Sequence, residues 1–213
     1  MALIKGSHVK DDTVTDIKLI ERYLRQNGTV GLTGAIRLSG DGIAWDDLRS
    51  PATGLKVPGI SDPTYDTDNI GYEFSHVASN VAHFITQLSH RYKQESNIYP
   101  HVHWSPTTTD TGNVRWVMSY KWTNIDAIDA GSFTDIEIIT AADGTAYKHQ
   151  KASFPAITGT GKNISSLLVI KLSRTGGAGG DTYGAAALLR EMDIHFQIDS
   201  FGSFYENDIK NEV

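Results

Sequence analysis

The feature that most constrains the fold is an alternation of apolar and polar side chains between Asn97 and Thr123. The apolar positions of its second half are Val114, Trp116, Met118, Tyr120 and Trp122. A period of two is typical of a half-buried β-strand, whereas a helix would scatter these side chains around its circumference. The intervening SPTTTDTG has turn chemistry. We therefore predict two antiparallel strands joined as a hairpin at the centre of a β-sandwich core.

The same rhythm of strand and turn continues from Ile70 onward. The predicted strands are Ile70 to Phe74, Val81 to Ser89, Ile98 to Ser105, Asn113 to Thr123, Ser132 to Thr140, Tyr147 to Ile157, Ile164 to Ser173 and Ala186 to Phe201. About eight strands without a long helix between them predict a mainly β protein, a jelly-roll-like antiparallel sandwich. A closed barrel or an immunoglobulin-like sandwich is the alternative. The predicted core residues are Trp104, Trp116, Met118, Tyr120, Trp122, Ile194, Phe196 and Ile198.

The sequence divides into four predicted parts. Residues 1–44 form an N-terminal attachment arm with one short helix, and residues 45–69, rich in Pro, Asp, Ser, Thr and Gly, form a long loop or linker. Residues 70–205 form the β-sandwich and residues 206–213 a polar tail. The apolar stripe of the helix is Val14, Ile17, Ile20 and Leu24.

Two features predict that the chain forms a homo-oligomer, with a trimer the expected state. The helix is too short to be stable without a partner. The strand from Ile164 to Leu172 is apolar on both faces, and a two-layer sandwich would leave one of these faces in water. Closed symmetry is the usual way in which proteins cover such surfaces.

Composition argues against several classes of function. A net charge of -6 argues against a nucleic-acid partner, which favours a basic surface. The absence of cysteine excludes disulfides, thiol nucleophiles and thiolate metal sites. No apolar run approaches the roughly 20 residues that cross a bilayer, so we predict no membrane insertion. The start, MALIKGSHVKDD, lacks the apolar segment of a signal peptide, and we expect synthesis in the cytoplasm.

His101 and His103 form an H-x-H motif on one face of a predicted strand. Two imidazoles at this spacing can chelate one metal ion, as in cupin enzymes, and His149 or His195 could complete such a site. Cupins follow the pair with a glutamate, but residues 106–108 here are Pro-Thr-Thr. We therefore predict a solvated or subunit-facing pair, no bound metal and no cofactor. A metal-binding, cupin-like enzyme is the alternative.

We recognise no catalytic motif and predict a protein that is not an enzyme. The acidic residues Asp46, Asp47, Asp62 and those in 66–68 lack the regular spacing of a calcium loop, so we interpret them as solvated loop acids. Gly176 to Gly180 is a hairpin tip and not a phosphate cradle, because it opens no helix. A carbohydrate-binding module is a further alternative, in which exposed tyrosines stack on sugar rings. These tyrosines are Tyr65, Tyr72, Tyr92 and Tyr99.

Several stretches resemble proteins of bacteriophage virions. The run HVKDDTVTDIKL (His8 to Leu19) resembles attachment segments of tail-fibre proteins. The stretches WDDLRSPATG, DNIGYEFS, LSHRYKQESNIYPHVHW and GNVRWVMSYKW resemble a family of phage structural proteins with a "DDLRFP"-like segment and a "HPHIHW"-like strand. Ser50 and Tyr99 depart from that pattern.

The resemblance implies a non-enzymatic structural component of a virion, placed on the head, neck or tail as a fibre, decoration or adaptor protein. Residues 1–69 would anchor it to other virion proteins. The sandwich would project and aid host attachment, with a host surface glycan as a further partner. The expected location is the virion.

Overall fold

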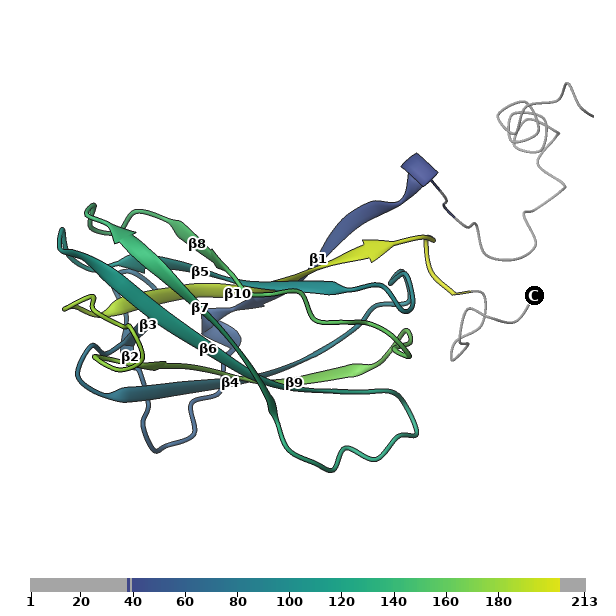
Figure 1. The fold of residues 1–213 in the computed structure, drawn as a ribbon, viewed down its shortest axis with the longest axis horizontal. Helices are drawn as coiled ribbons and strands as arrows, with labels where there is room; N and C mark the ends of the chain where they lie inside the picture. The colour runs from purple at the N-terminus through teal and green to yellow at the C-terminus, as the bar shows by residue number, and fades with distance from the viewer. Residues whose placement is uncertain (1–37, 39, 204–213) are drawn as a thin grey trace, which may run out of the picture. The chain divides into compact units, whose positions relative to one another are not determined.

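The computed structural model describes residue 38 and residues 40–203. These residues form two antiparallel β-sheets packed face to face, which confirms the predicted fold class (Figure 1). The helix predicted around Val14 to Leu24 and the tail 206–213 lie outside the described residues. Within the described part, no helix is long and apolar enough to cross a membrane.

The larger sheet is built around strand β10. Its strands are β1 (Ala44–Pro51), β2 (Thr64–Asp66), β3 (Gly71–Phe74), β5 (Ile98–Pro106), β8 (Gln150–Ser153) and β10 (Ala187–Ile198). On one side β10 pairs with β5, and β8 follows β5. On the other side β10 pairs first with β3 and then with β1, so this long strand carries three neighbours.

The smaller sheet has the strand order β4-β9-β6-β7. Its strands are β4 (Ser79–Gln87), β6 (Thr111–Thr123), β7 (Thr134–Asp143) and β9 (Leu167–Thr175). Two short 3-10 helices, η3 (Gly40–Gly42) and η4 (Ala52–Gly54), flank β1.

The core lies between the two sheets and contains the predicted residues. Seven of them are buried, namely Trp104, Trp116, Met118, Trp122, Ile194, Phe196 and Ile198. Tyr120 is only half-buried and packs against this core. Burial of one apolar face of each strand is what the period of two indicated.

The predicted hairpin between Asn97 and Thr123 is wrong. β5 belongs to the larger sheet and β6 to the smaller one, so the turn between them carries the chain from one sheet to the other. Trp104 of β5 and Trp116 of β6 therefore meet across the core, with ring centroids 6.3 Å apart. Both arrangements bury the same side of each strand, and for this reason the alternation could not distinguish them.

The segment 45–69 also differs from its prediction as a loop. It contains β1, which pairs with β10 through eight residues, and β2 at its end. β1 has no continuous apolar face, because its outward side chains are Trp45, Asp47 and Arg49. Backbone hydrogen bonds to β10 hold such a strand, and a hydropathy pattern does not reveal them.

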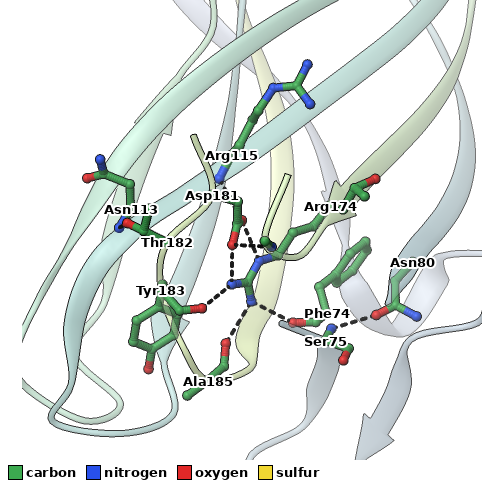
Figure 2. Close-up of polar contacts among 12 residues, drawn as sticks. Phe74, Ser75, Asn80, Asn113, Arg115, Arg174, Asp181, Thr182, Tyr183 and Ala185 are labelled. Atoms are coloured by element: carbon green, nitrogen blue, oxygen red, sulfur yellow. Dashed lines mark hydrogen bonds and ion pairs between the residues drawn. The ribbon is translucent and has the colours of Figure 1, made fainter. Parts of the chain in front are cut away.

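A fully buried arginine connects the two sheets near one end of the core. Figure 2 shows Arg174 of β9 surrounded by acceptors from Phe74 and from the segment 181–185. Its guanidinium donates to both carboxylate oxygens of Asp181, at 2.8 and 2.9 Å. It also donates to the backbone carbonyls of Phe74, Tyr183 and Ala185. All five guanidinium N–H groups are thereby satisfied, as burial of this group requires.

The glycine-rich stretch 176–180 delivers Asp181 to this arginine. A Cβ atom on Gly176 would lie 2.1 Å from the carbonyl carbon of His76, so only glycine fits there. Asp181 also accepts from the backbone N–H of Arg115, at 3.0 Å. The stretch is therefore a structural loop at one end of the sandwich. The predicted hairpin tip is wrong, because β9 and β10 on either side of it lie in different sheets and do not pair.

Candidate functional site

Four histidines and two aspartates gather on the outer face of the larger sheet. His101 and His103 lie on β5, Asp193 and His195 on β10, Asp47 on β1, and His149 just before β8. We call these six residues the histidine cluster. The strand register explains it, because Asp193 is directly opposite His101 and His195 is directly opposite Asp47. Side chains two residues apart then share the outward face.

Asp193 is the centre of the histidine cluster. Its side chain is only 7% exposed, although it lies on the outer face. Oδ1 contacts Nε2 of His101, and Oδ2 lies 3.4 Å from Nε2 of His103. Neither contact is a well-formed hydrogen bond, and Oδ1 is one of the buried polar atoms of the described residues that have no hydrogen-bond partner.

The other histidines surround this centre. Nδ1 of His103 and Nε2 of His149 are 2.6 Å apart, a hydrogen-bond distance. Nε2 of His195 lies 2.9 Å from Oδ1 of Asp47. The rings of His101 and His195 stack edge to face with centroids 4.2 Å apart, and this packing buries His101.

The environment shifts the pKa values of two of these groups, His103 and Asp193. Burial lowers the pKa of His103, and the neighbouring His101 and His149 lower it further. Asp193 acts to raise this pKa but does not outweigh them. Burial acts to raise the pKa of Asp193, but the contact with His101 and the charges of three nearby imidazoles outweigh it. The pKa of Asp193 therefore lies below its usual value, and this side chain is a carboxylate at neutral pH.

The histidine cluster forms one side of a concavity of about 750 Å³. Its remaining lining includes the cations Arg49, Lys151 and Arg190 and the carboxylate of Glu191. Arg49 and Glu191 form a bidentate ion pair, with atoms 2.6 and 2.8 Å apart. The surface therefore offers many hydrogen-bond donors and acceptors on a rigid sheet.

Two exposed aromatic side chains adjoin this polar surface. Trp45 of β1 is 55% exposed and Tyr99 of β5 is 40% exposed, and their rings meet edge to face at 5.3 Å. Tyr99 is opposite His195 in the register, which places the pair beside the histidine cluster. An exposed aromatic pair next to a polar hollow is typical of a ligand-binding surface.

The structure separates the four tyrosines that the carbohydrate-binding alternative would use as platforms for sugar rings. Tyr92 is fully buried and cannot act as a platform, which corrects the prediction for this residue. Tyr72 is half-buried, and Tyr65 is exposed but pairs with Tyr72 on β2 and β3, whereas the histidine cluster lies on β1, β5 and β10. Of the four, Tyr99 alone adjoins the histidine cluster. Trp45 was missed as a candidate because it falls in the segment predicted as a loop.

The aspartates that the sequence analysis interpreted as solvated loop acids have different surroundings in the structure. Asp62 and Asp66 accept backbone N–H groups of their own loops, at 2.7 and 2.9 Å. Asp46 pairs with Arg91, with atoms 2.9 Å apart. Asp47 is the one that joins the histidine cluster. His101 and His103 share the outward face as predicted, but His101 is buried and not solvated.

A scan against protein-family models and a search of the curated proteins found no match. Several solved structures are similar. The CBM36-1 domain of a multidomain xylanase from the hindgut metagenome of Trinervitermes trinervoides has 5% identity and a TM-score of 0.41, over 70% of this chain and 96% of that one. A family 35 carbohydrate-binding module from Clostridium thermocellum has 8% identity and a TM-score of 0.42, over 70% and 97%. A family 35 module from Cellvibrio japonicus has 10% identity and a TM-score of 0.40, over 70% and 92%.

These comparisons contradict the function expected from the resemblance to phage proteins. All three similar structures are carbohydrate-binding modules, and none of the three is a virion component. The expectation of a structural virion protein, anchored through residues 1–69, is therefore corrected. At this identity and TM-score the likeness concerns the fold alone and assigns no ligand.

Proposed function

We propose that the sandwich is a carbohydrate-binding module that holds a glycan on the outer face of its larger sheet. The observation that carries this proposal is the exposed pair of Trp45 and Tyr99 beside the concavity of the histidine cluster. One face of a sugar ring presents C–H groups, which pack on aromatic rings, and its rim presents hydroxyl groups. An aromatic platform next to charged donors and acceptors matches both properties.

The hydroxyl groups of the glycan would be bound by the lining of the concavity. Arg49 and Glu191 already pair with each other, and a hydroxyl can accept from one and donate to the other. Lys151 and Arg190 offer further donors. The role is one of binding, and the expectation that the chain is not an enzyme stays a prediction.

We expect Trp45→Ala and Tyr99→Ala each to weaken glycan binding about tenfold or more, because truncating an aromatic anchor typically removes over 1 kcal/mol. Tyr65→Ala is the matched control. Tyr65 is 42% exposed and pairs with Tyr72 at 5.1 Å, but on β2 and not beside the concavity. Affinity electrophoresis against a panel of neutral and acidic polysaccharides would identify a ligand, and calorimetry would give the constants. Equal losses in all three variants, or no retardation of the wild type, would refute the proposal.

We also propose that the full chain is a homo-oligomer, with the trimer expected from its sequence. What supports this is the outer face of the smaller sheet, where Ile85 is 64% exposed and lies opposite Val169 in the register. Light scattering should give a mass of three 23.3 kDa chains, and Ile85→Lys should lower it. Ile128→Lys, in a loop and 85% exposed, is the control. A monomeric wild type at micromolar concentration would contradict the prediction.

A further inference from the structure

We propose that His101, His103 and Asp193 bind one divalent transition-metal ion at the floor of the histidine cluster. This reverses the expectation, drawn from the sequence, that no metal is bound. It does not depend on the proposed glycan, because the metal is measured alone. Three observations support it, namely the spacing of the donor atoms, the unsatisfied carboxylate oxygen and the hydrogen bond behind His103.

The donor atoms already lie near the spacing of a metal site. One ligand atom from each of the three residues lies within 4.8 Å of the others. Bond lengths of about 2.0–2.2 Å place neighbouring ligands of a tetrahedral ion about 3.4 Å apart. The distance from Oδ2 of Asp193 to Nε2 of His103 is 3.4 Å. Oδ1 of Asp193 and Nε2 of His101 lie closer together than this, so rotations about side-chain bonds would have to separate that pair to admit the ion.

Asp193 also presents an oxygen that needs a positive partner. Its Oδ1 is buried and lacks a hydrogen bond, although it contacts Nε2 of His101. A buried carboxylate oxygen without a well-formed hydrogen bond is unfavourable unless the neighbouring imidazole carries a proton. A cation between this oxygen and the imidazole nitrogens would satisfy all of them, because each would offer it a lone pair.

The hydrogen bond between His103 and His149 would orient the ring of His103 for metal binding. If Nδ1–H of His103 donates to Nε2 of His149, the lone pair of His103 is on Nε2, which faces Asp193. Metal-binding histidines almost always use their second nitrogen in this way. His149 is then a positioning residue and not a ligand. His195 and Asp47 flank the site. Together with Asp193 they form a second group of closely spaced ligand atoms, so Asp193 belongs to both groups.

The donor types select the class of metal. Two imidazole nitrogens and one carboxylate suit Zn²⁺ and its first-row neighbours, whereas Ca²⁺ and Mg²⁺ prefer oxygen ligands alone. Three protein ligands leave a further coordination position, which a water molecule would occupy. The competing explanation is a metal-free ion pair, in which a proton on an imidazole compensates Asp193.

The test is a titration of the chelator-treated full chain with Co²⁺, followed by its visible absorption, and with Zn²⁺ by calorimetry. We expect one equivalent of either ion to bind. Asp193→Asn and His103→Ala should abolish the Co²⁺ spectrum, and His149→Ala should weaken binding about 10- to 100-fold. His83→Ala, a histidine of β4 outside the cluster, should bind as the wild type does.

Circular dichroism of each variant separates lost binding from lost folding, and Zn²⁺ should raise the melting temperature of the wild type but not of Asp193→Asn. Nitrogen chemical shifts of the imidazole rings provide a readout that needs no substitution, since metal binding should change the chemical shift of Nε2 of His103. Absence of stoichiometric binding, or binding unchanged in Asp193→Asn, would overturn the proposal in favour of the metal-free ion pair.

Discussion

Replacing Arg174 by methionine is expected to lower the free energy of unfolding by about 3–5 kcal/mol, the usual effect of removing one partner of a buried ion pair. Methionine occupies a similar volume, so the loss would come mainly from electrostatics. The carboxylate of Asp181 would remain buried without its cation. The carbonyls of Phe74, Tyr183 and Ala185 would each lose a donor at the same time.

Urea unfolding followed by fluorescence measures this loss, and Arg91→Met is the matched control. Arg91 makes a similar contact with Asp46, but the side chains are 44% and 36% exposed. Exposed pairs contribute about 0–1 kcal/mol, so the control should unfold almost as the wild type does. The double variant Arg174→Met with Asp181→Leu should recover part of the loss, because it leaves no unpaired charge. An Arg174→Met variant as stable as the control would show that the arginine contributes little.

Trp116→Ala is expected to lower the free energy of unfolding by about 3–5 kcal/mol, because truncating a large buried side chain leaves a cavity. Trp116 is fully buried and packs edge to face against Phe74, with centroids 5.2 Å apart, and against Trp104 from the other sheet. The cavity would therefore lie between the two sheets, where neither can close over it without moving the other.

Trp116→Phe separates the packing of this side chain from its polar atom. Among the described residues, Nε1 of Trp116 has no hydrogen-bond partner, so phenylalanine removes no hydrogen bond. We expect a clearly smaller loss than for alanine. Trp45→Ala, which removes an exposed indole, should change stability by about 0.5 kcal/mol or less. If Trp116→Ala were as mild as Trp45→Ala, the assigned core would be wrong. Chemical denaturation of the three variants under one set of conditions decides between these outcomes.

The sequence by itself determined the fold class and which side of β5, β6 and β10 faces the core. Trp116, Met118 and Ile194 are buried because a strand sends alternate side chains to opposite faces, and this period is written directly in the sequence. The same rule placed His101 and His103 together on the outward face of one strand. Both inferences depend on the alternation of side chains along one strand, which does not depend on the strands that pair with it.

Only the tertiary structure decided which strands are neighbours. The pairing of β10 with β5 and β1 brings Asp193, His195 and Asp47 to the histidine pair, although the three strands lie far apart in the sequence. The placement of β5 and β6 in different sheets was likewise undetermined by their alternation. The physical reason is that strand pairing uses backbone hydrogen bonds, which every residue can form and proline forms through its carbonyl alone, so the pattern of side chains fixes faces and not partners.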